Sequence, residues 1–239
     1  MRVIWLSFLH MLKFIQRDMM LFMAGIAPFV AGTTIHFGVP ILEKILVHMT
    51  GFPSVLSPYY GLFDIIFAFI APTMFCFVVA MIMLEEHDDS IDRYLYVTGL
   101  GRNGYFVSHI ILPALASFII TVILLPVFQL TTLSLWAVLS LSATGTLQGI
   151  IIALLIVTLS KNKLEGMAVA KISSTIILGT VSPYFFQSSF IYFLSFLPSF
   201  WIGKAMHDQN LVYMLSAILI AGSWILILRK LFNRKFSML

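Results

Sequence analysis

The sequence predicts an all-α membrane protein with six transmembrane helices, an N-terminal interfacial helix and an outer re-entrant hairpin before the last span. Of its 239 residues, 60% are hydrophobic and only 10% are charged, and the mean hydropathy is +1.03. Soluble domains carry about 25% charged residues, so this chain has too few charges to cover a surface in contact with water. The apolar residues form continuous blocks rather than alternating segments of about ten residues, which excludes a transmembrane β-barrel.

The apolar blocks define the six predicted spans. About 20 apolar residues cross a bilayer as a helix, so a chain of this length holds about six spans with short connections and no soluble domain of ordinary size. The predicted helices cover residues 19–37, 61–84, 105–128, 134–160, 167–187 and 210–228. The second is the clearest, because Leu62 to Leu84 contains one charge, Asp64, near its start. Residues 1–239 are therefore expected to form a single membrane domain.

The basic residues orient these spans. Six spans place both termini on the same side of the membrane, and that side collects all but two of the 14 Lys and Arg residues, the exceptions being Lys44 and Lys204. Cytoplasmic loops are enriched in Lys and Arg, so both termini are predicted to be cytoplasmic. An odd number of spans would divide the basic tails between the two sides and weaken this asymmetry.

Residues 1–18 carry an amphipathic pattern. His10, Lys13 and Arg17 fall at positions i, i+3 and i+7 of a helix, and bulky apolar side chains lie largely on the opposite face. This pattern predicts a helix lying in the cytoplasmic interface of the membrane. A ragged start to the first span is the alternative.

Half of the acidic residues lie at the end of the second span. The five are Glu85, Glu86, Asp88, Asp89 and Asp92. Beyond the N-capping residues Asp88, Asp89 and Ser90, the apolar residues Ile91, Tyr94 and Leu95 recur at helical spacing. The cytoplasmic loop 85–104 is therefore expected to contain a short helix, suited to dock into a groove on a partner. A solvated loop that merely clears the headgroups is the alternative.

Motifs for catalysis are weak or absent in the sequence. The Glu85-Glu86 pair superficially resembles the glutamates of a metal-dependent intramembrane protease, but Ser90 stands where that pattern has an arginine. Neither H-E-x-x-H nor G-x-S-x-G occurs, and the single cysteine, Cys76, excludes a thiolate metal site. The P-loop pattern is also absent, so any ATP hydrolysis belongs to another polypeptide. We therefore expect no catalytic, cofactor-binding or metal-binding residue in this chain.

Three polar residues inside the predicted spans are candidates for a substrate path or for helix packing. They are Asp64, His109 and Gln148. Polar groups within the membrane are functional candidates by default. The sparse polar groups suit a hydrophobic or amphipathic cargo, although 13 methionines and 22 phenylalanines would equally suit a lipid-facing surface.

The segment from Leu84 to Tyr105 resembles the loop between the second and third spans of ABC-2 type exporter permeases. In that family an acidic pair ends the second span, a short coupling helix follows, and a Thr-Pro-Leu-like turn leads to a basic residue and an aromatic residue. Here Gly99 replaces the usual proline. The turn 161–166, the segment 182–201 and the helix 1–18 are similar to the family's cytoplasmic turn, outer re-entrant hairpin and interfacial connecting helix. Within the family, the loop is most similar to small permeases for drug or fluoroquinolone export.

The resemblance implies a bacterial plasma-membrane exporter in which two permease copies, expected to be a homodimer, bind two cytoplasmic ABC ATPase subunits. ATP and Mg would be held by the ATPase, and the permease itself would be no enzyme and would contact lipid but no nucleic acid. Nucleotide-driven closure would act on the coupling helix and shift the permease between inward- and outward-facing states.

The resemblance also assigns roles to residues. The expected docking residues are Asp88, Asp89, Ile91, Asp92, Arg93, Tyr94 and Tyr96. Glu85 and Glu86 are expected to form interfacial ion pairs with Arg17 or Lys171. Residues 188–209 are expected to re-enter the outer leaflet without crossing it. The cargo would be a drug-like molecule or a peptide. The alternative from a different class is a stand-alone polytopic membrane protein, either an intramembrane enzyme or a scaffold.

Overall fold

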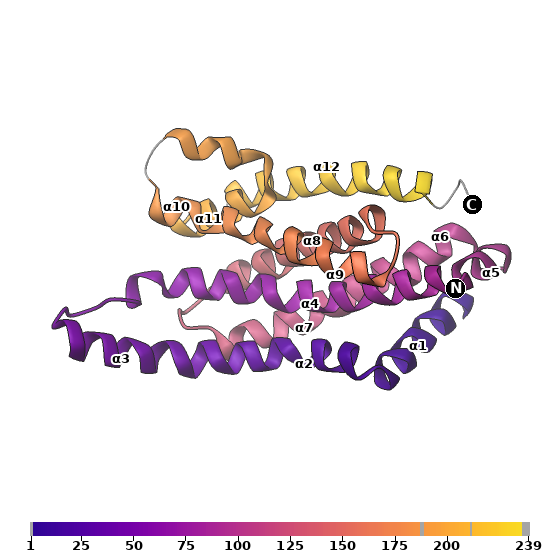
Figure 1. The fold of residues 1–239 in the computed structure, drawn as a ribbon. Helices are drawn as coiled ribbons and strands as arrows, with labels where there is room; N and C mark the ends of the chain where they lie inside the picture. The colour runs from indigo at the N-terminus through magenta and orange to yellow at the C-terminus, as the bar shows by residue number, and fades with distance from the viewer. Residues whose placement is uncertain (1, 187–188, 211, 236–239) are drawn as a thin grey trace.

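The computed structural model describes residues 2–186, 189–210 and 212–235, and in these residues all regular structure is helical (Figure 1). Five helical stretches in this part of the chain are long and apolar enough to cross a membrane. They are Met19–Thr50, Ser57–Asp88, Gly101–Phe128, Leu135–Leu159 and Val212–Lys235. The predicted all-helical fold is confirmed, and five of the six predicted spans correspond to stretches suited to cross a membrane.

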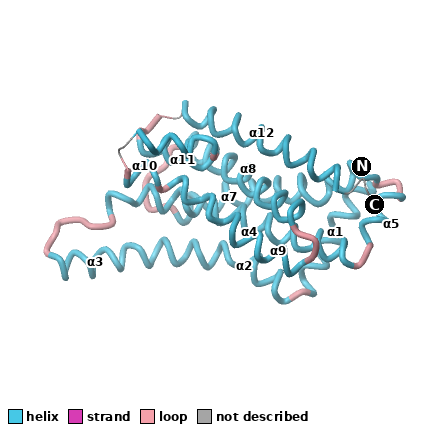
Figure 2. Tube along the Cα trace, turned by 45° about the horizontal axis from the view of Figure 1, so that its top comes forward, coloured by secondary structure: helices cyan, strands magenta, loops and turns pink. Residues whose placement is uncertain are grey.

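The first stretch is longer than the predicted span 19–37. Helices α2 (Met19–Thr33) and α3 (Val39–Thr50) are joined by a π-helical turn at Thr34–Gly38 and form one rod, whose α3 end stands apart from the other helices (Figure 2). Asp18 begins the rod by accepting hydrogen bonds from the backbone amides of its first turn. Gly51, in the left-handed conformation at φ 71°, ends it.

Glu43, which sequence reasoning missed, fastens the loop that follows α3. Its buried carboxylate accepts hydrogen bonds from the backbone amides of Val55 and Leu56, at 3.0 and 2.6 Å, and from the hydroxyl of Ser57 at 2.9 Å. This charge is therefore a structural anchor for the turn into the second stretch.

The core lies between α4 (Tyr60–Asp88) and α8 (Leu135–Leu159), whose facing side chains are largely buried. Small residues allow these two helices to approach closely. A Cβ atom added at Gly145 would lie 2.3 Å from the carbonyl oxygen of Ala68, and one at Gly149 would lie 2.9 Å from that of Pro72. The two helices can therefore approach this closely because Gly145 and Gly149 have no side chains.

The remaining helices surround this pair. They are α1 (Arg2–Arg17), α5 (Ile91–Val97), α6 (Gly101–Phe106), α7 (Leu112–Phe128), α9 (Lys163–Ser174), α10 (Ser182–Phe185), α11 (Pro198–His207) and α12 (Val212–Lys235). A π-helical turn at Val107–Ile111 joins α6 to α7, and a 3-10 segment at Ser189–Phe196 precedes α11. Helices α1, α5 and α6 and the end of α12 lie at one end of the molecule, and α3, α10 and α11 lie towards the other (Figure 1).

The predicted fifth span, 167–187, is not one continuous α-helix. Helix α9 passes into a 3-10 segment, Thr175–Thr180, before α10, and residue 187 lies outside the described residues. The hydroxyls of Ser174 and Thr175 bond back to backbone carbonyls within the preceding turn, and Pro183 removes a backbone donor. Such residues weaken a regular α-helix, which explains the irregular path.

Candidate functional site

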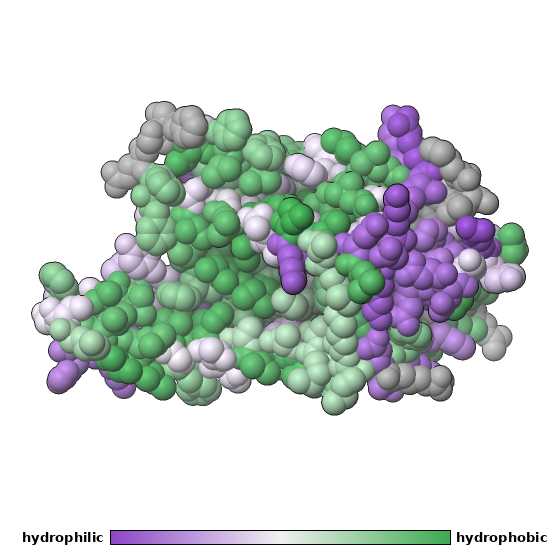
Figure 3. Space-filling model, viewed as in Figure 1, coloured by the Kyte–Doolittle hydropathy of each residue, from purple (hydrophilic) through white to green (hydrophobic). Residues whose placement is uncertain are grey.

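The candidate site begins where α4 ends and α5 starts. Ser90 adopts the left-handed conformation, with φ 60°, and makes no capping hydrogen bond, so the predicted capping role is wrong. The left-handed residue instead turns the chain sharply away from α4. Helix α5 therefore projects from the end of the molecule over which hydrophilic side chains gather (Figure 3).

One side of α5 is open to solvent, and we call Ile91, Tyr94 and Val97 its exposed face. These residues recur every three positions, and Tyr94 and Val97 are 72% and 85% exposed. Arg93 on α5 and the preceding Asp88 and Asp89 are also exposed. Five of the seven predicted docking residues are thus available to a partner. Sequence reasoning missed Val97, although its position three residues after Tyr94 would have identified it.

The other side of α5 faces inward, so the docking role predicted for Asp92 and Tyr96 does not fit their position. Asp92 is fully buried, with its Oδ2 atom 2.8 Å from Nδ1 of His87. Tyr96 is half-buried and packs edge-on against Tyr105, with ring centroids 5.2 Å apart. Helical geometry explains the difference, because residues four apart share a face and Asp92 and Tyr96 lie opposite Tyr94. These two residues hold α5 against the protein.

Behind α5, a buried cluster joins the second membrane stretch to the third. Glu86 accepts a hydrogen bond of 2.7 Å from the hydroxyl of Tyr105, and its other oxygen lies 3.3 Å from Nε2 of His109. The rings of Tyr105 and His109 stack with centroids 4.1 Å apart. Glu86 therefore does not pair with Lys171 as predicted, and the predicted pairing with Arg17 involves a side chain outside the described residues. His109 is a packing residue in this arrangement, because its ring is enclosed by these contacts.

A second electrostatic junction centres on Lys163, at the start of α9. Its ammonium group lies 2.6 Å from Oε2 of Glu85 and 3.1 Å from Oδ2 of Asp18, and its amide donates to Asp88 at 3.1 Å. One residue thus connects the starts of α2 and α9 with the end of α4. Local sequence sets its position, because the side chain of the N-cap residue Asn162 accepts a hydrogen bond from the amide of Glu165, and the Glu165 carboxylate accepts one from the amide of Lys161.

Glu85 thus pairs with Lys163 rather than with the predicted Lys171. Lys171 is exposed and makes no ion pair within the part of the chain that the structure describes, and the side chain of Arg17 lies outside that part. Partial burial opposes ionisation of Asp18, but hydrogen bonds from Lys163 and from backbone amides outweigh it and lower the pKa of Asp18. Burial likewise opposes the charge of Lys163, but Glu85 and Asp18 outweigh it and raise the pKa of Lys163.

Replacing Lys163 by methionine is expected to lower the melting temperature of the purified protein by about 2–4 °C, because a partly exposed ion-pair network contributes about 1 kcal/mol. The lowered pKa of Asp18 means that this contribution is present above the ordinary aspartate value of about 3.9 and is lost as the pH falls through the folded value. The raised pKa of Lys163 means that the contribution of these ion pairs to stability is present below about pH 10 and is lost at higher pH.

Thermal unfolding across pH measures this difference. The exposed Lys171, changed to methionine, is the matched control and is expected to leave the melting temperature unchanged. Equal melting temperatures for the Lys163 variant and the wild type at pH 7 would contradict the role of the junction.

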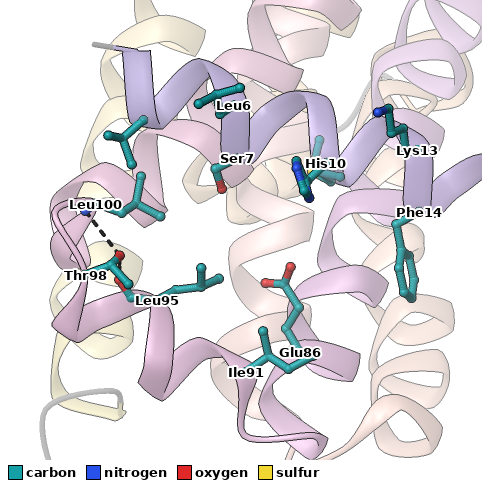
Figure 4. Close-up of a pocket in the computed structure, with 12 residues that line it drawn as sticks. Leu6, Ser7, His10, Lys13, Phe14, Glu86, Ile91, Leu95, Thr98 and Leu100 are labelled. Carbon is teal, nitrogen blue, oxygen red and sulfur yellow. Dashed lines mark hydrogen bonds between the residues drawn. The ribbon is translucent and has the colours of Figure 1, made fainter.

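A groove of about 690 Å³ separates α1 from the segment that carries α5. Leu6, Ser7 and His10 border it from α1, and Leu95 and the carboxylate of Glu86 face them from the other side (Figure 4). The predicted interfacial helix therefore lies directly across from α5. Movement of α5 would change the width of this groove.

The remaining two candidates for a substrate path have different surroundings. Asp64 is buried and accepts hydrogen bonds from the amides of Leu130 and Thr131, at 2.7 and 2.9 Å, and from the hydroxyl of Thr131. It therefore fixes the loop between α7 and α8. Gln148 is buried on α8, and its amide group has no hydrogen-bond partner within the described residues. Of the three polar candidates, Gln148 alone has no structural partner there.

The described residues contain no group of three His, Cys, Asp or Glu side chains arranged to hold a metal ion. Comparison with known protein families matches residues 11–229 to the family described as "Fluoroquinolones export permease protein Rv2686c-like". Neither a curated protein nor a solved structure matches the chain.

Proposed function

The chain belongs to the family of Rv2686c-like fluoroquinolone export permeases, and from this premise we propose that it is the membrane subunit of an ATP-driven ABC exporter. The single observation that carries the proposal is the exposed face of α5, which projects beyond the membrane-spanning helices. An apolar and aromatic helix face left open to solvent is typical of a surface that docks into a partner's groove.

The proposed topology has six crossings. Besides the five long apolar stretches, the segment between Lys163 and Phe185 makes the crossing that is fifth in chain order. Lys163 bonds to Asp88 at one end of this segment, and Phe185 stacks on Tyr59 at the other, with ring centroids 5.4 Å apart. Asp88 and Tyr59 mark the two ends of α4, whose 29 residues span about 43 Å. That length exceeds the hydrocarbon core of about 30 Å, which supports a full crossing by 163–185.

The proposed orientation places both termini in the cytoplasm. The end of the molecule that carries α5 also carries the start of α1 and the end of α12, together with most Lys and Arg residues. Lys44 and Lys204 lie on α3 and α11, towards the opposite end. This asymmetry follows the enrichment of basic residues on the cytoplasmic side.

The proposed outer hairpin comprises the 3-10 segment Ser189–Phe196 and α11. The indole of Trp224 donates a hydrogen bond of 3.0 Å to the carbonyl of Phe196. Trp224 lies twelve residues, or about 18 Å, along α12 from its start. The hairpin therefore reaches back toward the middle of α12, as a re-entrant segment would.

The exposed face of α5 is proposed to contact a separate ATPase subunit, which would hold ATP and Mg. Movement of α5 would pass to the membrane helices through the Tyr96–Tyr105 contact and through Asp92 and His87, which join α5 to α4. A second copy of the permease would complete the exporter, with lipid around it. Coupling of this kind is reciprocal, so cargo binding would also alter ATP turnover.

The proposed cargo is a fluoroquinolone or another amphipathic drug-like molecule, moved out of a bacterial cell across its plasma membrane. The family name supports this cargo class. The few polar side chains inside the spans suit a molecule whose aromatic body is apolar. The side-chain amide of Gln148 is proposed to form hydrogen bonds with the polar groups of the cargo, because this buried amide has no hydrogen-bond partner within the described residues.

Accumulation of a fluorescent fluoroquinolone in the native host tests the proposal. Deleting the gene is expected to raise the steady-state drug content, and restoring the gene is expected to lower it again. Depleting ATP while maintaining the membrane potential is expected to abolish the difference. A difference that survives ATP depletion would contradict an ATP-driven exporter.

A further inference from the structure

A basic pocket lies between the start of α6 and the end of α12. It has a volume of about 470 Å³, and the described residues that line it all carry polar side chains. These are Arg102, Asn103, Lys230, Asn233 and Arg234. Three positive charges and two amides line one concavity, and none of its described lining residues is acidic. Such a lining is complementary to a single compact anion.

The two walls of this pocket are held together by aromatic packing. Phe232, buried on α12, packs edge-on against Phe106 of α6 with ring centroids 5.6 Å apart. The guanidinium of Arg229 lies 5.1 Å from the centre of the same Phe106 ring. The spacing between the basic side chains of α6 and α12 is therefore set before any ligand binds.

The surface of α12 that precedes the pocket in the chain is apolar. Leu226 and Ile227 precede Lys230 by four and three residues, so they share its face of α12, and they are 69% and 60% exposed. Lys230 and Arg234 continue the same face one and two turns later. This face changes from exposed aliphatic side chains to basic ones within one helical turn, at the end of a membrane-spanning helix.

We propose that this pocket binds the phosphate headgroup of an anionic phospholipid, whose acyl chains lie along Leu226 and Ile227. The guanidinium groups of Arg102 and Arg234 would donate paired hydrogen bonds to the phosphate oxygens, and the ammonium of Lys230 would add charge. The amides of Asn103 and Asn233 suit a headgroup hydroxyl. A free phosphate would use the same basic groups, but only a lipid also uses the adjoining aliphatic face.

The bound lipid would also restrict the movement of α5. The guanidinium of Arg102 lies 5.9 Å from the ring of Tyr96, on the inward side of that helix. A phosphate that fixes Arg102 therefore restrains the residue against which α5 packs. Anionic lipid is thus a structural cofactor of the helix proposed to meet the ATPase.

Native mass spectrometry of the purified full chain tests the proposal, with phosphatidylglycerol as the probe and phosphatidylcholine as the neutral comparison. The wild type is expected to retain phosphatidylglycerol preferentially. The triple variant Arg102→Gln, Lys230→Gln, Arg234→Gln is expected to bind phosphatidylglycerol at least about tenfold more weakly than the wild type. The matched control, Lys13→Gln, Lys161→Gln, Lys171→Gln, removes the same charge outside the pocket and is expected to retain it.

Additional measurements distinguish between the possible occupants of the pocket. Millimolar inorganic phosphate is expected not to displace the lipid, and displacement would overturn the assignment to a lipid in favour of a free anion. Equal loss of lipid in both triple variants would show a general charge effect and overturn the site. Should the triple variant fail to purify, Lys230→Gln alone is expected to weaken binding measurably. Retention of lipid with loss of a bound ATPase would assign the pocket to protein contact and overturn the proposal.

Discussion

Replacing Tyr94 by alanine is expected to uncouple ATP hydrolysis from export while leaving the membrane helices folded. Tyr94 is 72% exposed on α5, so its removal leaves no cavity inside the permease. If it is an anchor in the ATPase groove, its truncation costs about 2 kcal/mol or more. Binding of the ATPase would then weaken about thirtyfold or more. Drug accumulation and ATPase affinity, measured on the same variant, check both expectations.

Trp136 supplies the matched control for this experiment. It is also 72% exposed, but it lies at the start of α8, towards the opposite end of the molecule from α5. Replacing Trp136 by alanine is expected to leave ATPase affinity unchanged. Full export by the Tyr94 variant, or an equal loss in both variants, would contradict the docking role of the exposed face of α5.

Replacing Gly145 by alanine is expected to destabilise the permease by about 1–3 kcal/mol, because the new methyl group would overlap the backbone of α4. The built Cβ lies only 2.3 Å from the carbonyl oxygen of Ala68, and a backbone atom yields less readily than a side chain. The two central helices must therefore separate. Thermal unfolding of the purified variant measures the loss.

Gly222 on α12 is the control, because a Cβ added there meets nothing within 4 Å. Alanine is a better helix former than glycine by up to about 1 kcal/mol, so Gly222→Ala is expected to leave stability unchanged or to raise it. A Gly145 variant as stable as the Gly222 variant would show that the α4–α8 interface is not closely packed.

Composition and apolar block length were sufficient to predict the helical membrane fold, because each span must satisfy its own backbone hydrogen bonds. The ends of the helices were less predictable. The first rod continues past residue 37 to Thr50, where Gly51 in the left-handed conformation ends it, although Glu43 and Lys44 interrupt the hydropathy. The fifth segment departs from an α-helix because Ser, Thr and Pro residues act locally within an otherwise apolar run.

The short helix of the candidate site was predicted in position, but its contacts with the rest of the protein were not. Helical spacing identified Ile91 and Tyr94, and the same rule applied once more would have added Val97 and turned Asp92 inward. The partners of Glu85 and Glu86 were not predictable. Lys163 and Tyr105 approach them only when segments distant in the chain pack together. Asp64 looked like a candidate for a cargo path, yet its contact with Thr131 joins positions 67 residues apart.

Purification of the tagged chain under mild extraction from its native membrane, with mass spectrometry to identify what accompanies it, tests whether the permease assembles with a separate ATPase. We expect a stoichiometric partner with a Walker A sequence, which accompanies the wild type and the Trp136 variant and is lost when Tyr94 and Val97 are both replaced by alanine. A chain that emerges without any ATPase under every mild extraction would contradict the assignment as the membrane subunit of an ABC exporter.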